Sequence, residues 1–487
     1  MGAGASQRLP VDSLRDELVA AMAASARALI HAPTGSGKST RVPQMLAAMT
    51  ADTEAPGRVV VLQPRRIAAR MLARRVSAER GVELGAEVGY QTRFDRALSP
   101  RTRILFITEG ILLRMLRGDP LLGGVSALVF DEFHERHLHG DLGLALARSL
   151  QSTQRPDLRL CVMSATLDSS QVARYLDPCR TLSVESRTYP VEITYHPPPA
   201  ATGGRQPPVW DSAADAFRQL AADGLDGHVL VFMPGAYEIN RTIRAIGALE
   251  CARGLELLPL HGGLAAADQD AAVGPSPTPK VIVATNVAET SLTIDGVTSV
   301  IDSGLVRCAR FDPRRGIDTL LVGKSDQAAS EQRAGRAGRT APGRCLRLWS
   351  QASHLQRERF TAPEIQRVDL SECLLALLAL GHSRPREFPW FERPDERMLG
   401  HAEALLHDLA AIDGGGGRTA RGARLAAFPA HPRVAALLDE AAASGCLEAA
   451  SELAALLQGA PLLPRSRDPE TARRRDACAG GHDSDIH

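Results

Sequence analysis

The sequence predicts an α/β protein in which two doubly wound parallel-sheet domains follow one another and precede a mostly helical C-terminal region. Short, nearly continuous apolar runs alternate with helical patterns, as expected when parallel strands are buried on both faces. The alternation stops at a stretch rich in Pro and Gly, residues 196–209, and then begins again. At 487 residues the chain is also too long for one hydrophobic core.

In the first domain the apolar runs predict strands that are separated by helices such as Ser39–Met49 and Ile67–Arg80. The predicted strands of this domain are Arg27–Ala32, Arg58–Gln63, Arg103–Thr108, Ala127–Asp131 and Arg159–Ser164. The predicted strands of the second domain are His228–Met233, Leu255–Leu260, Lys280–Thr285 and Ser299–Asp302.

After Trp349 a helical periodicity replaces the strand pattern. Amphipathic helices are predicted at Leu370–Leu380 and His401–Ala411, and an Ala-rich helical stretch is predicted at Pro432–Leu457. The last residues have little apolar content, so they are predicted to be disordered.

Composition limits the class of protein. The net charge is +1, so binding of nucleic acid would depend on local basic patches. Aromatic residues make up only 4% of the chain, which argues against base recognition mainly by stacking. The eight cysteines form no CxxC pair, so neither a zinc site nor a disulfide framework is indicated. The sequence contains no apolar signal core or membrane-spanning run, and a soluble cytoplasmic protein is expected.

A phosphate-binding loop is predicted where the first strand meets the next helix, in the segment APTGSGKST. Glycines let backbone amides turn toward phosphates, and the helix N-terminus adds a positive dipole end. Lys38, one of only three lysines, would neutralise the β- and γ-phosphates of ATP, and Ser39 would ligate Mg²⁺. The alternative, a Gly/Ser turn with an incidental lysine, is disfavoured by this context. The nucleotide-binding residues expected in the loop are Thr34, Gly35, Ser36, Gly37, Lys38, Ser39 and Thr40.

A pair of acids, Asp131 and Glu132, follows the apolar run ALVF. The carboxyl end of a parallel strand is where α/β sheets bind ligands. Asp131 is expected to hold Mg²⁺ through water, and Glu132 is expected to take a proton from the attacking water. His134, His137 and His139 lie close together, but HExxH is absent, so polar loop residues are a better interpretation than a zinc site.

The second domain contains QRAGRAGR, which ends at Arg339. Arg336 and Arg339 are spaced to lie on one face of a helix, from which they could reach a γ-phosphate as arginine fingers. The alternative is a solvated basic helix, and the embedded glycines disfavour it because they lower helix propensity.

Together these segments resemble the DEAH/DExH branch of the superfamily 2 helicases, in order from about Arg27 to Ala460. The stretches DEFHER, LVFMPGAYEI, RFDPRRGID and QRAGRAGR are most similar to the bacterial HrpB-type helicases. The resemblance implies an ATP-dependent RNA helicase, a hydrolase that uses ATP and Mg²⁺ and moves 3′→5′. It also implies two RecA-like domains (1–192 and 193–350), a winged-helix domain (351–422), a partial ratchet-like helical segment (423–460) and a disordered tail (461–487).

The resemblance also assigns catalytic roles. His134 completes motif II, and Gln332 would position the attacking water together with Glu132. Ser164 and Thr166 belong to motif III, which couples hydrolysis to movement of the domains.

Two further residues are assigned to the nucleotide by the same resemblance. Asp295 ends motif V, and Arg75 would stack on the adenine. Val273 stands where the family has a phenylalanine on the other side of the base, so loose base selectivity is expected.

A nucleic-acid face is implied as well. Arg65 and Arg66 resemble motif Ia, Thr108 begins motif Ib, Arg93 matches the hook-turn arginine and Thr290 lies in motif V. Guanidinium and hydroxyl groups suit phosphate oxygens, so little sequence specificity and a strong salt dependence are expected. The stretch Leu305–Leu321 matches the family's strand-separating β-hairpin. RNA is the expected partner, and DNA stays open.

Two alternatives remain at this point. Relatives continue through further domains, so this chain is expected to be C-terminally truncated and could be a nucleic-acid-binding ATPase, or a remnant, that does not unwind. A P-loop enzyme unrelated to nucleic acid is the other alternative, and the paired motifs V and VI disfavour it.

Overall fold

The computed structural model describes residues 8–50, 57–165, 170–185, 189–199, 206–290, 294–458 and 469–478. The chain divides into two compact units. Unit 1 comprises residues 1–368 and 389–393, and unit 2 comprises residues 369–388 and 394–487. No helix within the described ranges is both long enough and apolar enough to cross a membrane.

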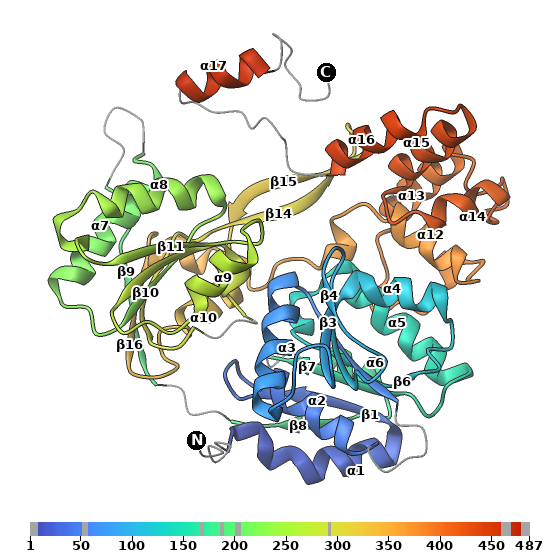
Figure 1. Ribbon diagram of the computed structural model, residues 1–487, viewed down its shortest axis with the longest axis horizontal. Helices are drawn as coiled ribbons and strands as arrows, with labels where there is room; N and C mark the ends of the chain where they lie inside the picture. The colour runs from blue at the N-terminus through green and yellow to red at the C-terminus, as the bar shows by residue number, and fades with distance from the viewer. Residues whose placement is uncertain are drawn as a thin grey trace. The chain divides into compact units, whose positions relative to one another are not determined.

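The first half of unit 1 is built on an eight-stranded sheet with the order β4-β3-β5-β2-β6-β7-β1-β8 (Figure 1). Its strands pair in parallel except for β4, which runs antiparallel to β3. The strands are β1 (Arg27–His31), β2 (Arg58–Gln63), β3 (Val88–Gln91), β4 (Arg96–Ala97), β5 (Ile104–Thr108), β6 (Val125–Phe130), β7 (Arg159–Ser164) and β8 (Arg180–Ser183).

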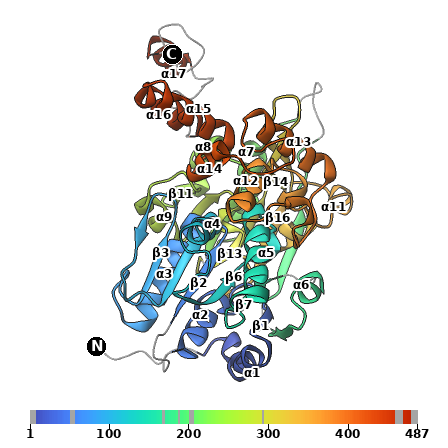
Figure 2. The same cartoon turned by 90° about the vertical axis from the view of Figure 1, so that its right-hand side faces the viewer.

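Helices cover both faces of this sheet. Helices α1, α2 and α3 share a core with one face, in which Met45 and Val76 pack against Val59 and Val61. Helices α4 and α5 pack together on the other face, where Gly143 lies close to Leu112, and Figure 2 shows α3 and α5 on opposite sides of the strands. The helices are α1 (Arg15–Ser25), α2 (Lys38–Ala48), α3 (Arg66–Arg80), α4 (Glu109–Gly118), α5 (Leu138–Thr153) and α6 (Ser170–Tyr175).

The second half of unit 1 contains a six-stranded parallel sheet with the order β11-β12-β10-β13-β16-β9. One face packs against α7 and α8 and the other against α9 and α10, so this sheet is doubly wound too. Its strands are β9 (Val191–Tyr195), β10 (His228–Phe232), β11 (Glu256–Leu260), β12 (Lys280–Ala284), β13 (Val297–Asp302) and β16 (Gly343–Arg347). The helices are α7 (Val209–Ala222), α8 (Ala236–Gly247), α9 (Ala266–Val273), α10 (Gln327–Ala334) and α11 (Gln351–Leu355).

The doubly wound fold class is confirmed, and each predicted strand is present within about two residues of its predicted ends. The structure adds strands that were not predicted, among them β3, β9 and β16. β9 pairs with β16 of the second sheet, so the predicted boundary between residues 192 and 193 falls inside a strand of the second domain. β9 has no buried position along its length, which explains why it gave no apolar run.

The predicted hairpin is present as a separate antiparallel pair, β14 (Leu305–Asp312) and β15 (Ile317–Lys324). Several of its apolar side chains are exposed, including Leu320 and Val322. Unit 2 is helical. It contains the segment that was expected to be ratchet-like and most of the expected winged-helix domain, whereas residues 351–368 and 389–393 of that expected domain belong to unit 1. Its helices are α12 (Ser371–Ala379), α13 (Glu396–Asp408), α14 (Ala420–Ala427), α15 (Pro432–Ala443), α16 (Leu447–Gln458) and α17 (Pro469–Cys478).

Helix α17 differs from the expectation of a tail without secondary structure over residues 461–487. It begins with Pro469 and continues with an Arg474–Glu470 ion pair of i,i+4 spacing, at 2.6 Å, which supports a helix locally. The rest of that predicted tail lies outside the described residues.

Candidate functional site

The predicted phosphate loop joins β1 to α2 at the carboxyl end of the first sheet. Gly35 and Gly37 have φ angles of +86° and +89°, a conformation that L side chains rarely adopt. The loop therefore turns at both glycines and places Lys38 and Ser39 in the first turn of α2. Backbone amides at a helix N-terminus, beside a buried lysine, form a donor set that suits a triphosphate.

A segment that was not predicted to matter supports this loop from outside. The Val11 amide donates to the Ser36 carbonyl at 3.1 Å. Leu9 lies against Gly37 so closely that a Cβ at residue 37 would be 2.6 Å from Leu9 Cδ1. The residues before α1 thus help to fix the shape of the loop, and no sequence motif signalled this role.

The acid pair stands where β6 ends. Asp131 accepts hydrogen bonds from Gln63 Nε2 at 2.7 Å and from the Glu132 amide at 2.9 Å, and it is also hydrogen-bonded to Ser39. Burial, followed by the neighbouring charge of Glu132, raises the pKa of Asp131 to about 6. A buried carboxylate beside a serine hydroxyl fits Mg²⁺, because the cation would relieve the charge that burial opposes.

Glu132 is held by the lysine of the phosphate loop. Lys38 Nζ lies 3.1 Å from Glu132 Oε1, and the two side chains are 3% and 2% exposed. Burial opposes ionisation of Glu132, but the charge and hydrogen bond of Lys38 together with the neighbouring His134 outweigh it, so the pKa of Glu132 lies below its usual value. The backbone at Glu132 has a φ of +51°, in the left-handed region, which is strained for a residue with a side chain.

His134 lies in the same group. Its Nδ1 accepts a hydrogen bond from the Ala165 amide at 3.3 Å, and Gln332 lies near the ring. Burial lowers the pKa of His134. Nδ1 is therefore unprotonated, and its 3.5 Å approach to Glu132 is a contact of a neutral ring rather than an ion pair.

The two predicted arginine fingers lie in a turn after α10, so the prediction that they share a helix face is wrong. The helix ends at Ala334, and a Cβ at Gly338 would meet the Tyr189 carbonyl oxygen at 2.5 Å. The second glycine thus allows the chain to pass close to Tyr189 instead of continuing as a helix.

Both arginines nevertheless lie close enough to Glu132 for its charge to act on their pKa values. Burial lowers the pKa of Arg336, the charge of Arg339 lowers it further, and Glu132 acts in the opposite direction. Burial also lowers the pKa of Arg339 to about 10 against the charges of Glu132 and Asp295. Arg336 Nε donates to the Glu289 carbonyl at 2.8 Å, which fixes its direction. Charged groups from both sheets therefore converge on Glu132.

Arg333 was not singled out from the sequence, although it is the most deeply paired arginine of the segment. It is 1% exposed and contacts Glu289 at 2.8 Å and Asp302 at 2.9 Å. These partners raise its pKa despite its burial. Arg333 thus anchors the turn that carries Arg336 and Arg339, and its spacing in QRAGRAGR gave no hint of this difference.

The residues predicted to hold the base occupy two helices that contact each other. Arg75 lies on α3, is 68% exposed and pairs with Glu79 at 2.9 Å. Val273 is the last residue of α9 and packs partly against the core of the second domain. α3 and α9 are held together by Asp270, which contacts Arg70 at 2.9 Å.

Two of the predicted nucleic-acid contacts meet at one carboxylate. Arg65 Nη2 lies 2.8 Å from Glu135 Oε2, and Thr290 Oγ1 donates to Glu135 Oε1 at 2.6 Å. His137 Nε2 is 3.0 Å from the same Glu135 oxygen as Arg65. Burial opposes ionisation of Glu135, but Arg65 and His137 outweigh it and hold its pKa well below the usual range.

The remaining predicted contacts are placed separately. Arg66 donates to the Gly262 carbonyl at 3.1 Å, Thr108 stands at the start of α4, and Arg93 is exposed and lies over the Phe94 ring at 5.0 Å. Ser164 ends β7. Thr166 and residues 291–293 of the predicted motif V lie outside the described residues.

His137 joins this network to the end of unit 1. Its Nδ1 lies 3.2 Å from Glu364, and hydrogen bonds to Glu135 and Glu364 raise its pKa well above the usual value although burial opposes this. Within the described ranges no group of three or more His, Cys, Asp or Glu side chains is arranged to hold a metal ion. His137 is thus a polar partner of two acids, Glu135 and Glu364.

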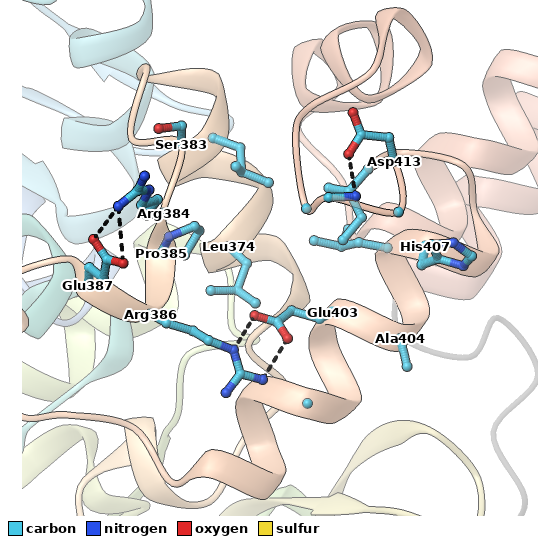
Figure 3. Close-up of a pocket in the computed structure, with 17 residues that line it drawn as sticks. Leu374, Ser383, Arg384, Pro385, Arg386, Glu387, Glu403, Ala404, His407 and Asp413 are labelled. Atoms are coloured by element: carbon cyan, nitrogen blue, oxygen red, sulfur yellow. Dashed lines mark hydrogen bonds and ion pairs between the residues drawn. The ribbon is translucent and has the colours of Figure 1, made fainter.

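Unit 2 contains a pocket of about 520 Å³ between α12, α13 and the glycine-rich turn after Asp413 (Figure 3). Its arginines are already paired with acids, Arg384 with Glu387 at 3.2 Å and Arg386 with Glu403 at 2.7 Å. The pocket thus presents neutralised charges, which distinguishes it from the strongly charged group around Glu132.

Comparisons with known proteins agree with this arrangement. Residues 14–175 match the DEAD/DEAH box helicase family, and residues 213–341 match the helicase conserved C-terminal domain. The ATP-dependent RNA helicase HrpB of Escherichia coli (strain K12) is 39% identical over 460 residues, which cover 94% of this chain. The probable ATP-dependent RNA helicase DHX35 of Homo sapiens is 38% identical over 475 residues, 93% of this chain and 66% of that protein.

The solved structures agree as well. The crystal structure of the Escherichia coli DEAH/RHA helicase HrpB superposes with a TM-score of 0.87 at 37% identity, over 97% of this chain and 60% of that one. The chain spans 56% of the length of the curated HrpB that it matches.

Proposed function

This chain belongs to the DEAD/DEAH box helicase family, and we propose that it is an ATP-dependent RNA helicase that hydrolyses ATP between its two parallel-sheet domains. One observation carries the proposal. Lys38 and Glu132 of the first domain and the arginines at 336 and 339 of the second form one charged group, in which all but the partly buried Arg339 are buried. Charges of this kind, drawn from two domains, suit a triphosphate bound between them.

ATP binding begins with an exchange of partners. The loop amides and Lys38 would hold the β- and γ-phosphates, and Lys38 would leave Glu132 to do so. Ser39 and Asp131 would hold Mg²⁺, which neutralises phosphate charge when it is bound. The raised pKa of Asp131 favours this, since binding a cation removes the cost of burying its carboxylate.

Hydrolysis then uses the carboxylate that Lys38 has released. Glu132 would accept a proton from the attacking water, and Gln332 with His134 would orient that water. Arg336 and Arg339 would stabilise the charge that spreads over the γ-phosphate oxygens, and arginine fingers in phosphoryl-transfer enzymes contribute roughly 10³–10⁵ in rate. Because the two arginines come from the second domain, loss of the γ-phosphate weakens the contact between the domains.

Nucleic acid would be held through its backbone by Arg65, Arg66, Arg93, Thr108 and Thr290. These groups suit phosphate oxygens and do not read bases, so binding is expected to be sequence-tolerant and salt-dependent. RNA is proposed as the substrate because the relatives named above are RNA helicases. The eight free cysteines suit a reducing compartment, so a cytoplasmic location is part of the proposal.

The experiment that tests this function is ATP turnover measured alone and with single-stranded RNA, single-stranded DNA or duplex RNA. The proposal expects strong stimulation by single-stranded RNA and separation of a duplex that has a single-stranded overhang. Turnover that is indifferent to every nucleic acid would contradict it. Stimulated turnover without strand separation would reduce the function to that of a nucleic-acid-dependent ATPase.

A further inference from the structure

We propose that Glu135 is an internal stand-in for an RNA phosphate, which occupies Arg65 and Thr290 until RNA displaces it and thereby transmits RNA binding to the ATP site. The inference rests on the proposed function, because it assumes that these two residues grip the nucleic-acid backbone.

The contacts match those of a bound phosphate. One Glu135 oxygen accepts a hydrogen bond from the Arg65 guanidinium at 2.8 Å, and the other accepts one from the Thr290 hydroxyl at 2.6 Å. A guanidinium and a hydroxyl are common donors to phosphate oxygens in protein–nucleic acid complexes. The carboxylate presents its two charged oxygens to donors from two different domains, as a backbone phosphate would.

The ion pair between Arg65 and Glu135 is shielded from solvent, so an RNA phosphate must compete with Glu135 for Arg65. The side chains of Arg65 and Glu135 are 17% and 11% exposed, so their attraction is less screened than that of a surface pair. An incoming phosphate must therefore replace Glu135 at Arg65 before it can bind there. RNA affinity is reduced by the free energy of that replacement.

Glu135 keeps a partner when it is displaced. His137 Nε2 contacts Glu135 at 3.0 Å and His137 Nδ1 contacts Glu364 at 3.2 Å, so both ring nitrogens face carboxylates. An imidazole that donates from both nitrogens is positively charged. His137 can therefore hold Glu135 after Arg65 and Thr290 have turned to RNA, which makes the exchange reversible.

The displacement would reach the ATP site through a short turn. Glu135 is the last residue of a single 3₁₀ turn, Phe133–Glu135, that follows Glu132 directly. The Glu135 amide donates to the Glu132 carbonyl at 2.9 Å, and φ is +51° at both Glu132 and Arg136. A turn enclosed by two strained residues has little freedom to absorb movement, so a shift of Glu135 is passed on to Glu132.

The test compares Glu135→Gln with Glu364→Gln in the full chain. Both variants remove one negative charge beside His137, but Glu364 contacts His137, the Leu138 amide and Arg367, whereas Glu135 contacts Arg65 and Thr290. Binding of a fluorescein-labelled single-stranded oligouridine is measured by anisotropy at one fixed salt concentration, and ATP turnover is measured with and without it. Glu135→Gln should tighten binding on the order of tenfold, the weight of one charge-assisted hydrogen bond. It should also raise turnover without RNA and reduce the stimulation by RNA.

Each outcome decides for or against the inference. Tighter binding by Glu135→Gln but not by Glu364→Gln supports it, as does loss of that gain in an Arg65→Ala background. Unchanged or weaker binding overturns it, because a merely structural glutamate would give that result, and equal tightening by both variants overturns it as general charge repulsion. Glu135→Asp, which withdraws the carboxylate by one methylene, should shift binding in the same direction and serves if Glu135→Gln does not fold. A wild-type chain without RNA stimulation would contradict the proposed function itself.

Discussion

Lys38 Nζ lies 3.1 Å from Glu132 Oε1, and both side chains are almost completely buried. The group expected to bind phosphate and the group expected to accept a proton thus neutralise each other. An ion pair this deeply buried is costly to break by removing one partner, since the other charge is left without compensation. When a triphosphate binds Lys38, the carboxylate of Glu132 loses its ion-pair partner. The buried negative charge of Glu132 is then tolerated only if arginines lie nearby to compensate it.

Replacing Lys38 by Ala should abolish RNA-stimulated ATP turnover, because the phosphates lose their lysine and Glu132 loses its counter-charge. Turnover should fall by at least about 10³-fold, as expected when a group that acts on the transferred phosphoryl is removed. The measurement is steady-state phosphate release. Arg253→Ala removes a positive charge from an 80% exposed site and should keep wild-type turnover. Wild-type turnover in Lys38→Ala would rule out the assigned nucleotide site.

Arg336 and Arg333 should respond differently to the same substitution. Arg336→Ala should lower kcat by about 10³-fold while nucleotide binding and thermal stability stay close to wild type. Arg333→Ala should destabilise the fold by about 3 to 5 kcal/mol, since Asp302 and Glu289 are left buried without their cation. Thermal unfolding and kcat, measured on both variants, check the contrast. A large loss of stability in Arg336→Ala would argue for a structural role there.

Asp131→Asn should stabilise the nucleotide-free protein above pH 6 while abolishing turnover. Burial and the charge of Glu132 raise the pKa of Asp131 to about 6. Between about pH 4 and pH 6, Asp131 is therefore protonated in the folded chain and ionised in the unfolded chain. Stability therefore falls as pH rises from about 4, the pKa of an unfolded Asp, to about 6, at a cost of roughly 2 to 3 kcal/mol. The asparagine variant lacks this cost, and the difference should vanish below about pH 4. Urea unfolding at several pH values measures it, and a gap that widens toward acid pH would contradict the assignment.

His431→Ala should destabilise unit 2 by about 1 to 3 kcal/mol without altering the nucleotide site. His431 Nε2 lies 2.9 Å from Asp369, joining the start of α12 to the start of α15. Burial opposes ionisation of Asp369, but hydrogen bonds from His431 and from the Ser371 amide outweigh it and lower its pKa. A lowered acid pKa adds stability above the pKa of the unfolded acid, and this is lost as pH falls through the folded value. The free energy of unfolding of both proteins is measured near neutrality and in acid. The difference between wild type and His431→Ala should be largest near neutrality and should mostly disappear in acid.

Strands that are buried on both faces could be predicted from the sequence. β2 and β10 consist of almost continuous apolar residues, and their predicted positions agree with the structure to within a residue. β9 and β3 are short, and β9 is partly exposed throughout, so local periodicity could not distinguish them from loops. Helix α10 ends at Ala334, directly before Gly335, and the tertiary contact with Tyr189 that requires Gly338 is not visible in local sequence.

The candidate site divides in the same way. Asp131 and Glu132 were found because they follow a strand directly, and Lys38 was found because it ends a Gly-rich loop between a strand and a helix. The Glu135 contacts were not, because Arg65 and Thr290 lie 70 and 155 residues away along the chain. Only the folded arrangement of the two sheets brings such partners together.

Leu9 and Gly37 place residue 37 under two independent restrictions. Its φ of +89° disfavours any side chain, and Leu9 Cδ1 occupies the space in which a Cβ would stand. Trimming Leu9 to alanine would remove Cδ1 but would leave the Cβ of residue 9 at 3.0 Å and the backbone angle unchanged, so this single replacement would not accommodate alanine at position 37. A side chain at residue 37 would require both a different backbone angle and a displacement of Leu9. Glycine is therefore favoured at this position by the geometry of the loop, independently of any role in phosphate binding.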